Sequence, residues 1–509
     1  MEQVNTLLVF DSVDPNRLID TLSQNFSAEA KTPHRERRIY YDTFDWALYN
    51  SGMSLYRSSH EYSLRSIQDD RTLQTVEWKS NTPLNFIEAF SENVVSEKLK
   101  KVLAIRALLP RGRLDSQIRT IHILDEFDKT VLHVQVEKIR AGTASVINLV
   151  TLKPVRGYRK HHRQVAQLLR GIGDERKPTE VFKLLLGAAG ETPGEYSSNM
   201  RVQLSPDMTA RDATVIILER LLEVMRQNAP GITADIDTEC LHDFRVAVRR
   251  TRSVLGQIKD VFPAESIKTF KKRFAELGQA SNKLRDLDVF LLNKQRYEAM
   301  LPAAFRPQLS PLFKLLQSDR DKRQKEFVSV LKGRSCQSLL NKWETFLSSP
   351  TQDGAENPKD YDRPAIELAR KYIFKRYTQV MALGGTINDS TPDEELHRLR
   401  IQCKNLRYLF EFFSSLFPQA KATTLIKQLK RLQDNLGEYN DLALQQSQLE
   451  SIMSRSTKKQ NENVQSAAAT GGIIAMLHQR QQVVRKAFSK SFNEFSGGKN
   501  KKLYRELFA

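Results

Sequence analysis

The chain is poor in cysteine and has no long apolar run. Its three cysteines, Cys240, Cys336 and Cys403, are too few and too widely spaced for a disulfide framework or a Cys-x-x-Cys metal site. We interpret them as small buried hydrophobic residues. No stretch approaches the roughly 18 apolar residues that a membrane-spanning helix needs. The first residues also lack the basic and apolar regions of a secretory signal. These absences predict a cytoplasmic protein without a membrane partner.

The chain also has fewer acidic than basic residues. The 509 residues include 79 Lys plus Arg but only 60 Asp plus Glu, which gives a formal net charge of +19. A charge of this size indicates an anionic partner. When the chain is divided at residue 186, the first part carries +5 and the rest +14, so the partner is expected to bind mainly the second part. The 40% of hydrophobic residues can build a sizeable core in two to four domains, which excludes disorder of the whole chain.

The hydrophobic pattern divides the chain into two regimes. Residues 62–67, 75–79, 130–138 and 146–151 alternate between apolar and polar side chains, which is the period of β-strands. In the third of these segments one face is polar, with His133, Gln135 and Glu137, so a sheet or barrel with one wet side is predicted. From about residue 204 the period becomes helical, with long segments at 213–228, 240–261 and 396–416.

The boundary between the regimes has the composition of a linker, with glycine, proline and serine gathered between Gly187 and Asn199. The predicted fold class is therefore multi-domain α+β. We expect an antiparallel β-barrel domain at residues 1–186, a linker at 187–204 and an all-α domain at 205–509. A loop at 351–359 separates two helical halves, at about 205–350 and 360–509, and residues 496–502 are predicted to be a mobile basic tail segment.

An internal repeat is the strongest signal in the chain. The sequence Leu-His-Asp-Phe-Arg-Val-Ala-Val-Arg-Arg-Thr-Arg at 241–252 returns as Leu-His-Arg-Leu-Arg-Ile-Gln-Cys-Lys-Asn-Leu-Arg at 396–407, an offset of 155 residues. The same offset aligns the Phe-Pro dipeptides at 262 and 417 and the Asp-Leu dipeptides at 286 and 441, with no gap. Two related helical bundles around a pseudo-two-fold axis are therefore predicted.

Each copy of the repeat carries basic side chains at i, i+3, i+7 and i+10. At about 100° per residue, these positions cover an arc of roughly 80° and make one cationic stripe. A solvated charged face is the alternative interpretation, but Leu241, Phe244 and Val248 lie in the neighbouring arc, so the stripe borders the core. Like charges this close cost stability unless an anion arrives, and phosphate suits the arginine fork. The stripes are His242, Arg245, Arg249 and Arg252, and His397, Arg400, Lys404 and Arg407.

Basic residues on the following segments could extend this surface. They are Lys272 and Arg285 after the first stripe, and Lys427 and Arg431 after the second. The acidic residues Asp286 and Asp441 are interpreted as structural partners that orient arginines, in preference to catalytic acids.

The repeated Leu-His-x-x-Arg-x-x-x-Arg/Lys-x-x-Arg motif, together with the following Leu-Arg-Asp-Leu-Asp at 284–288 and Leu-Gly-Glu-Tyr-Asn-Asp-Leu at 436–442, resembles the CHAD domain (conserved histidine α-helical domain). The resemblance covers about residues 205–509. It implies two pseudo-symmetric helical bundles around a basic pore that binds inorganic polyphosphate. Its binding residues would be the two stripes and the basic residues near Lys272 and Lys427.

Residues 40–57, from Tyr-Tyr-Asp-Thr-Phe-Asp to Ser-Leu-Tyr-Arg, are similar to a strand and turn of the CYTH domain, the barrel of the triphosphate tunnel metalloenzymes. That family opens with Glu-x-Glu-x-Lys, whose carboxylates hold a divalent metal for triphosphate hydrolysis. Here residues 3–9 read Gln-Val-Asn-Thr-Leu-Leu-Val, and 146–151 lack a later glutamate pair. We therefore predict no catalytic residue, metal or cofactor. Five basic residues could still present cations to a phosphate chain or lie on the barrel exterior: Arg57, Arg65, Lys79, Arg119 and Lys153.

The leading hypothesis is a non-enzymatic protein that binds inorganic polyphosphate in a basic groove or pore between two helical bundles. Other polyanions are further candidate ligands, and the expected location is the polyphosphate granule. One alternative is a metal-dependent inorganic triphosphatase in the first domain, with the helical domain as its substrate-binding module. The other is a nucleic-acid-binding protein, which charge alone permits although the stripes lack interleaved aromatic residues.

Overall fold

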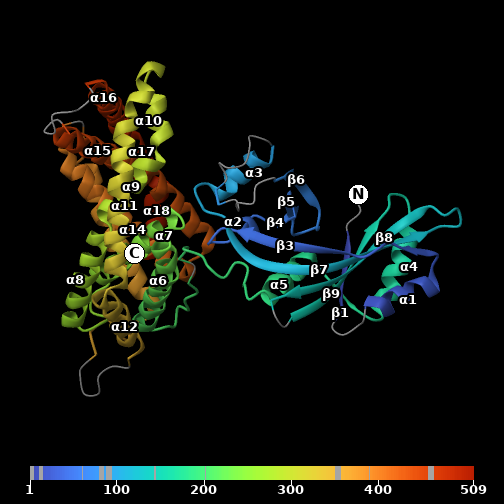
Figure 1. Ribbon diagram of the computed structural model, residues 1–509. Coiled ribbons are helices and arrows are strands. Elements are labelled where there is room, and N and C mark those ends of the chain that lie inside the picture. The colour runs from blue at the N-terminus through green and yellow to red at the C-terminus, as the bar shows by residue number, and fades with distance from the viewer. Residues whose placement is uncertain are drawn as a thin grey trace. The chain divides into compact units, whose positions relative to one another are not determined.

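The computed structural model describes residues 5–10, 15–59, 61–78, 85–86, 94–142, 145–200, 202–349, 357–388, 390–456 and 464–509 (Figure 1). The chain divides into two compact units, Met1–Ser198 and Asn199–Ala509. Most of the predicted loop at 351–359, and Lys79, lie outside the described residues. No helix within the described ranges is long and apolar enough to span a membrane.

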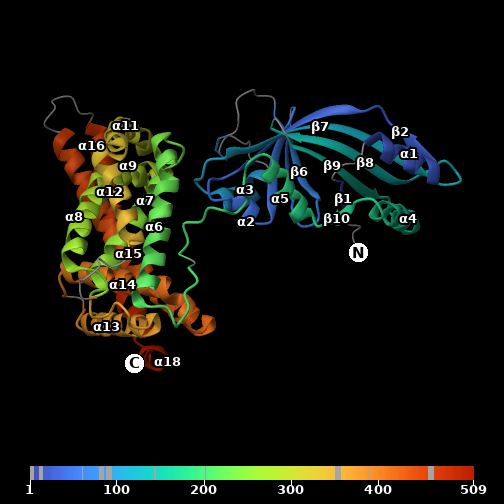
Figure 2. The same ribbon diagram turned by 90° about the horizontal axis from the view of Figure 1, so that it is seen from below.

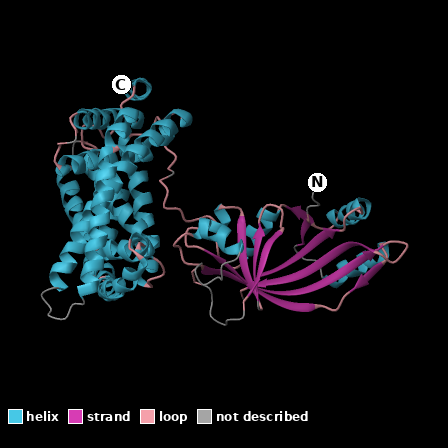
Figure 3. Cartoon of the chain, turned by 90° about the horizontal axis from the view of Figure 1, so that it is seen from above, coloured by secondary structure: helices cyan, strands magenta, loops and turns pink. Residues whose placement is uncertain are grey.

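The first unit is built on one antiparallel sheet of ten strands, which confirms the predicted antiparallel β domain (Figure 3). The strand order is β10-β1-β9-β8-β7-β3-β4-β5-β6, and β2 pairs with β7 beside this path. The strands are β1 Thr6–Phe10, β2 Ala28–Ala30, β3 His34–Asp42, β4 Met53–Ser58, β5 Glu61–Ser66, β6 Thr72–Glu77, β7 Leu109–Leu124, β8 Thr130–Ala141, β9 Ser145–Pro154 and β10 Asp174–Arg176.

Side-chain alternation gives this sheet two distinct faces. On β8, Val134 and Val136 pack in a core with residues of α1 and α4, and we call this side the outer face. Gln135 and Glu137 point to the opposite side and line a cavity beside α5, which we call the cavity face. The predicted wet side of the sheet is thus the cavity face. The helices are α1 Pro15–Asn25, α2 Ala47–Asn50, α3 Val94–Leu103, α4 Arg159–Arg170 and α5 Pro178–Ala188.

The second unit consists of packed helices around one large core (Figure 2). Met200, Val202 and Leu204, in the predicted linker, are buried in this core. The helices are α6 Ala210–Thr233, α7 Thr238–Gln257, α8 Ala264–Ala280, α9 Asn282–Leu292, α10 Lys294–Met300, α11 Ser310–Lys332, α12 Arg334–Ser348, α13 Ala365–Gly385, α14 Asp393–Phe413, α15 Gln419–Ser456, α16 Val464–Lys486, α17 Phe488–Phe495 and α18 Gly498–Phe508. Two short 3-10 helices, η2 Ala303–Leu309 and η3 Ser414–Leu416, join them.

The predicted repeat is visible in the helix boundaries. Helices α6, α7 and α8 begin at residues 210, 238 and 264, and α13, α14 and α15 begin 155 residues later, at 365, 393 and 419. The starts of α6 and α13 also exchange backbone hydrogen bonds, from the Ala210 N–H to the Arg363 carbonyl (2.7 Å) and from the Ala365 N–H to the Met208 carbonyl (2.8 Å). Because donors and acceptors are again 155 residues apart, a pseudo-two-fold axis passes between the two helix starts.

The prediction of a mobile tail at 496–502 is wrong. Residues 498–508 form α18, whose Tyr504 and Phe508 are buried in the core. The Tyr504 ring stacks on Tyr377 of α13, with ring centroids 3.7 Å apart. The lysines of this segment lie on the exposed side of an amphipathic helix. The prediction failed because it used the basic composition of a few residues and not the apolar side of the same helix.

Candidate anion-binding site

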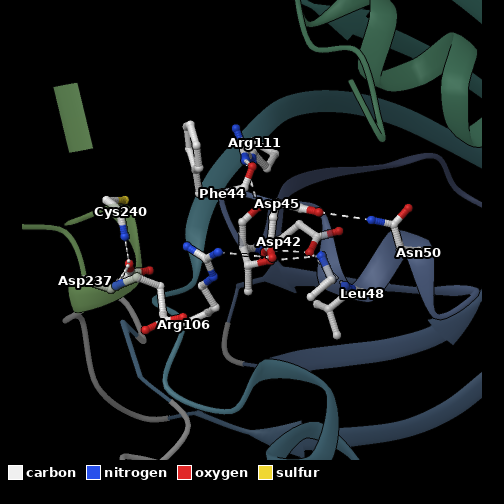
Figure 4. A network of polar contacts seen from close by, with 12 residues as sticks. Asp42, Phe44, Asp45, Leu48, Asn50, Arg106, Arg111, Asp237 and Cys240 are labelled. Carbon is white, nitrogen blue, oxygen red and sulfur yellow. Dashed lines mark hydrogen bonds and ion pairs between the residues drawn. The ribbon is translucent and has the colours of Figure 1, made fainter. Parts of the chain in front are cut away.

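The first stripe lies on α7, which begins at a well-formed N-cap. The Asp237 carboxylate accepts hydrogen bonds from the backbone N–H groups of Glu239 (2.9 Å) and Cys240 (3.1 Å), as the Asp237–Cys240 contact in Figure 4 shows. Leu241, Phe244 and Val248 are buried. The stripe therefore borders the core, as its spacing predicts.

The two stripe helices contact each other. Arg249 of α7 donates a hydrogen bond from Nε to the Tyr408 hydroxyl of α14 (2.7 Å). Arg250 forms an ion pair with Glu411 (2.5 Å), and its guanidinium also lies over the Tyr408 ring. The structure thus brings Arg249 of the first stripe against Tyr408, which directly follows the last residue of the second stripe.

The cations of the second stripe crowd around Lys404. Burial, together with the guanidinium groups of Arg249, Arg400 and Arg407, lowers the pKa of the Lys404 amine to about 7, against the opposing effect of Asp441. Arg400 donates a hydrogen bond to that carboxylate (3.0 Å). The carboxylates of Asp441 and Glu411 are fewer than the cations around Lys404, so the site keeps a net positive charge.

Arg245 is held in place by neutral acceptors. Its guanidinium donates to the Ser281 hydroxyl (2.6 Å) and to the Asn282 side-chain oxygen (3.0 Å), between α8 and α9. Burial, together with the neighbouring charge of Arg249, lowers the pKa of Arg245 to about 10. Its hydrogen-bond acceptors within the described part of the chain are uncharged, and the nearby carboxylates of Asp286 and Asp288 partly offset its positive charge.

The other predicted residues take varied positions. Arg285 is engaged inside the protein, because it donates to the Thr238 carbonyl (3.0 Å) and pairs with Glu239 (3.3 Å), tying α9 to the start of α7. Arg431 lies 3.8 Å from Glu494 of α17. His242 is half-buried, and His397 contacts the Asn440 side chain. Three further predicted residues have exposed side chains: Arg252, Lys272 and Lys427.

Sequence reasoning missed the acidic and hydroxyl partners of the site. Glu411 lies between Arg250 and Arg407 (3.2 Å from the latter). Its spacing of four residues from Arg407 was a readable signal for an ion pair. Tyr408 is buried, and its hydroxyl accepts the hydrogen bond from Arg249. Of the two aspartates, Asp441 accepts a hydrogen bond from Arg400, and Asp286 accepts one from Gln448 (3.0 Å). Burial raises the pKa of the Asp286 carboxyl group, and the charges of Arg245 and Arg285 oppose that rise.

A second polar site lies on the cavity face of the first unit. The cavity has a volume of about 340 Å³. Arg65 and Lys153, two of the basic residues named from the sequence, both line it. It also contains Arg38, Glu36 and Glu137, which come from β3 and β8. The alternation of residues 130–138 had placed Glu137 on the polar face of its strand. The sequence did not show that β3 would supply its partner, Arg38.

The cavity does not fit a divalent metal ion. Arg38 pairs with both Glu36 (3.5 Å) and Glu137, and Arg65 pairs with Asp70 (2.8 Å). Each carboxylate of the cavity therefore already faces a guanidinium, which repels a cation. Among the described residues no group of three or more His, Cys, Asp or Glu side chains could hold a metal.

The segment that resembles a CYTH turn is organised by a buried aspartate. The Asp42 carboxylate accepts hydrogen bonds from the backbone N–H groups of Thr43 (2.7 Å), Leu48 (2.9 Å) and Tyr49 (2.9 Å) (Figure 4). Arg111 donates to the carbonyl groups of Thr43 and Phe44 (2.7 Å each). These contacts satisfy the backbone of a tight turn, so the likeness in sequence reflects a structural motif.

Comparison with known proteins assigns part of the helical unit to a family. The family model of the CHAD domain matches residues 216–450, which include both stripe helices. This region is a CHAD domain. The CHAD domain contains the whole of the second stripe and Tyr408, and it extends to the part of α15 that carries Asp441. No curated protein matches the chain.

Solved structures are similar to each unit. The CHAD domain from the plant Ricinus communis covers 59% of this chain and 97% of its own, at 21% identity and a TM-score of 0.48. PptA from Streptomyces chartreusis covers 56% and 100%, at 12% identity and a TM-score of 0.42. A protein from Hippeastrum described with a dominant triphosphatase activity covers 38% and 100%, at 13% identity and a TM-score of 0.29.

Proposed function

We propose that the protein binds inorganic polyphosphate through the two stripes of its CHAD domain and associates with polyphosphate granules. The observation that carries the proposal is the meeting of the stripes at Arg249, Lys404 and Tyr408. Cations from two helices converge there, and the carboxylates beside them are too few to neutralise them. A linear phosphate polymer would supply regularly spaced oxyanions to such a row of guanidinium groups.

The proposal includes no hydrolytic activity. The cavity of the first unit pairs its carboxylates with Arg38 and Arg65, and no metal-binding cluster occurs in the parts of the chain that are described. A triphosphate would have to displace these internal ion pairs before it could bind the same arginines. We therefore regard binding without cleavage as the function that this arrangement supports best.

The test is a titration of the full chain with long-chain polyphosphate. The stripe variant carries Arg245→Gln, Arg249→Gln, Arg400→Gln and Arg407→Gln. We expect its affinity to fall at least about 100-fold. The slope of log K against log salt concentration should become shallower by about three, because four fewer counterions are released. A control variant neutralises four exposed lysines of α11, namely Lys314, Lys322, Lys325 and Lys332, and should bind like the unmodified protein. Equal losses in both variants would contradict the proposal.

Competition separates this function from nucleic-acid binding. Single-stranded nucleic acid at equal phosphate concentration should displace polyphosphate poorly, because Tyr408 is buried and cannot stack on a base. Equal displacement by nucleic acid would instead favour a general polyanion-binding protein.

Triphosphate hydrolysis in the first unit is the second candidate. It is favoured by the convergence of Arg38, Arg65 and Lys153 on one cavity. Phosphate release from inorganic triphosphate with magnesium or manganese decides between the two. We expect the unmodified protein to release no more phosphate than a variant in which Arg38 and Arg65 are replaced by glutamine. Clear phosphate release by the unmodified protein that this variant lacks would establish the enzyme.

A further inference from the structure

The outer face of the β sheet carries a group of basic side chains outside both sites described above. Strand register places Gln117 of β7 between Arg35 of β3 and Lys138 of β8, and Asp115 of β7 between Arg37 and Arg140. Arg113 continues the pattern on β7, opposite Ile39. We call this surface the outer basic face, defined by Arg35, Arg37, Arg113, Lys138 and Arg140.

Among the described residues, Asp115 is the carboxylate that forms ion pairs with members of this group, while Glu36, which also lines the hollow here, pairs with Arg38. Asp115 lies 2.6 Å from Arg37 and 3.4 Å from Arg113. No carboxylate in the described ranges forms an ion pair with Arg35, Lys138 or Arg140. The register places no two of these cations directly opposite each other, because Gln117 and Asp115 of β7 lie between β3 and β8. The surface nevertheless keeps an excess of positive charge, which favours an anionic ligand.

The outer basic face is separate from the cavity. Alternation along β3 sends Glu36 and Arg38 to the cavity face, and Arg35 and Arg37 to the opposite side. The hollow above Arg35, Arg37, Lys138 and Arg140 has a volume of about 540 Å³. On the same side, α3 packs against Leu55 and Leu64 farther along the sheet, while α1 and α4 pack against the β8 and β9 core. The basic residues lie in the stretch between these two helical covers.

We propose that the outer basic face is a second binding site for inorganic polyphosphate. Strands lie about 4.8 Å apart and alternate residues about 7 Å apart, so the five cations fall within roughly 10 by 14 Å. A chain of linked phosphates places several oxyanions within that area, and the four arginine forks can each bind two oxygens. The site stands independently of the CHAD stripes.

Nucleic acid fits this surface less well. The rows between the cations hold Gln117, Asp115 and Ile39, and none of them is an aromatic residue on which a base could stack. A duplex spaces its phosphates at about 3.4 Å of axis per strand around a cylinder, so few of them reach one compact patch at once.

The experiment uses the full chain and titrates it with polyphosphate in the stripe-variant background. The polyphosphate binding that remains in this background is the quantity measured. Adding Arg35→Gln, Arg37→Gln, Lys138→Gln and Arg140→Gln should lower this residual affinity at least about tenfold and reduce the salt slope by about three. The matched control neutralises four exposed residues on and before α4, Arg156, Arg159, Lys160 and Arg163, and should leave the residual binding unchanged. Thermal unfolding of each variant confirms that it folds.

The outcomes separate the two proposals. If the stripe variant alone retains no binding, or if the α4 control loses as much as the outer-face variant, the second site is refuted while the CHAD site stands. If the outer-face substitutions alone abolish binding and the stripe substitutions have no effect, the CHAD assignment is refuted. Displacement of the residual binding by duplex DNA at equal phosphate concentration would also overturn the polyphosphate assignment.

Discussion

Arg249 and Lys404 occupy equivalent positions in the two repeats, 155 residues apart, and interact where α7 contacts α14. An equivalent pair near the axis is a direct consequence of the pseudo-two-fold symmetry that the α6 and α13 starts reveal. The symmetry is imperfect, since one position is an arginine that stays charged and the other is a lysine whose amine can lose its proton.

The first prediction concerns the pH dependence of polyphosphate binding. The pKa of Lys404 in the free protein is lowered to about 7, so above that pH the amine is increasingly neutral. A bound polyanion favours the ammonium form, so binding takes up a proton and affinity falls as pH rises from 7 toward 9, by at most about tenfold per pH unit for one proton. Isothermal titration in buffers of different ionisation enthalpy measures the uptake.

Lys404→Arg is the matched control for that prediction. It keeps a positive charge at the same place but does not titrate in this range. We expect it to bind at pH 7 at least as tightly as the unmodified protein and to take up no proton. Identical proton uptake in both proteins would show that another group titrates.

The second prediction concerns the orientation of Arg249. Tyr408→Phe removes the hydroxyl that accepts its hydrogen bond and leaves the ring in place. Affinity for polyphosphate should fall about threefold to tenfold, while the free energy of unfolding changes by roughly 1 kcal/mol. Tyr297→Phe is the control, because the Tyr297 hydroxyl is buried without a hydrogen-bond partner. A loss of affinity equal to that of the control would show that Tyr408 only packs.

The third prediction uses Asp42 to probe the first unit. Burial raises the pKa of its carboxyl group to about 6, so the folded chain holds this proton more tightly than the unfolded chain does. The stability that the group contributes is therefore present below pH 4 and is lost as pH rises through 6, at about 1.4 kcal/mol per unit. Unfolding of the unmodified protein and of Asp42→Asn, compared between pH 4 and 7, should show this slope only in the former. Parallel curves would contradict it.

The fourth prediction tests the packing of α17 on α13. A Cβ atom added at Gly384 would lie 2.0 Å from the Phe492 ring, whereas one added at Gly385 would meet nothing within 4 Å. Gly384→Ala should therefore cost about 1–3 kcal/mol of unfolding free energy. The neighbouring Gly385→Ala should be neutral within about 1 kcal/mol. Denaturant unfolding of both variants measures the difference, and similar midpoints would show that the helices do not approach so closely.

Much of the second unit could be read from residue spacing. The offset of 155 between the two Leu-His motifs predicts the starts of the paired helices, since each helix is a local structure whose apolar face and cap lie within its own sequence. The border between stripe and core at Leu241 and Phe244 follows from the same periodicity. In the first unit, alternation along β8 separates Val134 from Gln135 for the same reason.

Partners from distant segments could not be read in this way. The sequence predicted Arg285 as part of the anion surface, yet its guanidinium is engaged by Glu239 and the Thr238 carbonyl. Residues 496–502 look like a basic tail because the core on which this segment packs is built by other helices, and the apolar side chains that meet it, Leu503, Tyr504, Leu507 and Phe508, come after the basic run.

The amino-acid sequence by itself therefore determined the division of the chain, the repeat and the two cationic stripes, because each rests on local periodicity and on counts of charge. Only the tertiary structure decided which of those charges stay available. Packing brings Arg249 against Tyr408 and leaves Lys404 among like charges, while it neutralises Arg38 with Glu137 across strands a hundred residues apart in the chain. The physical reason is that ion pairing and desolvation depend on distances of a few ångströms, which only the fold sets.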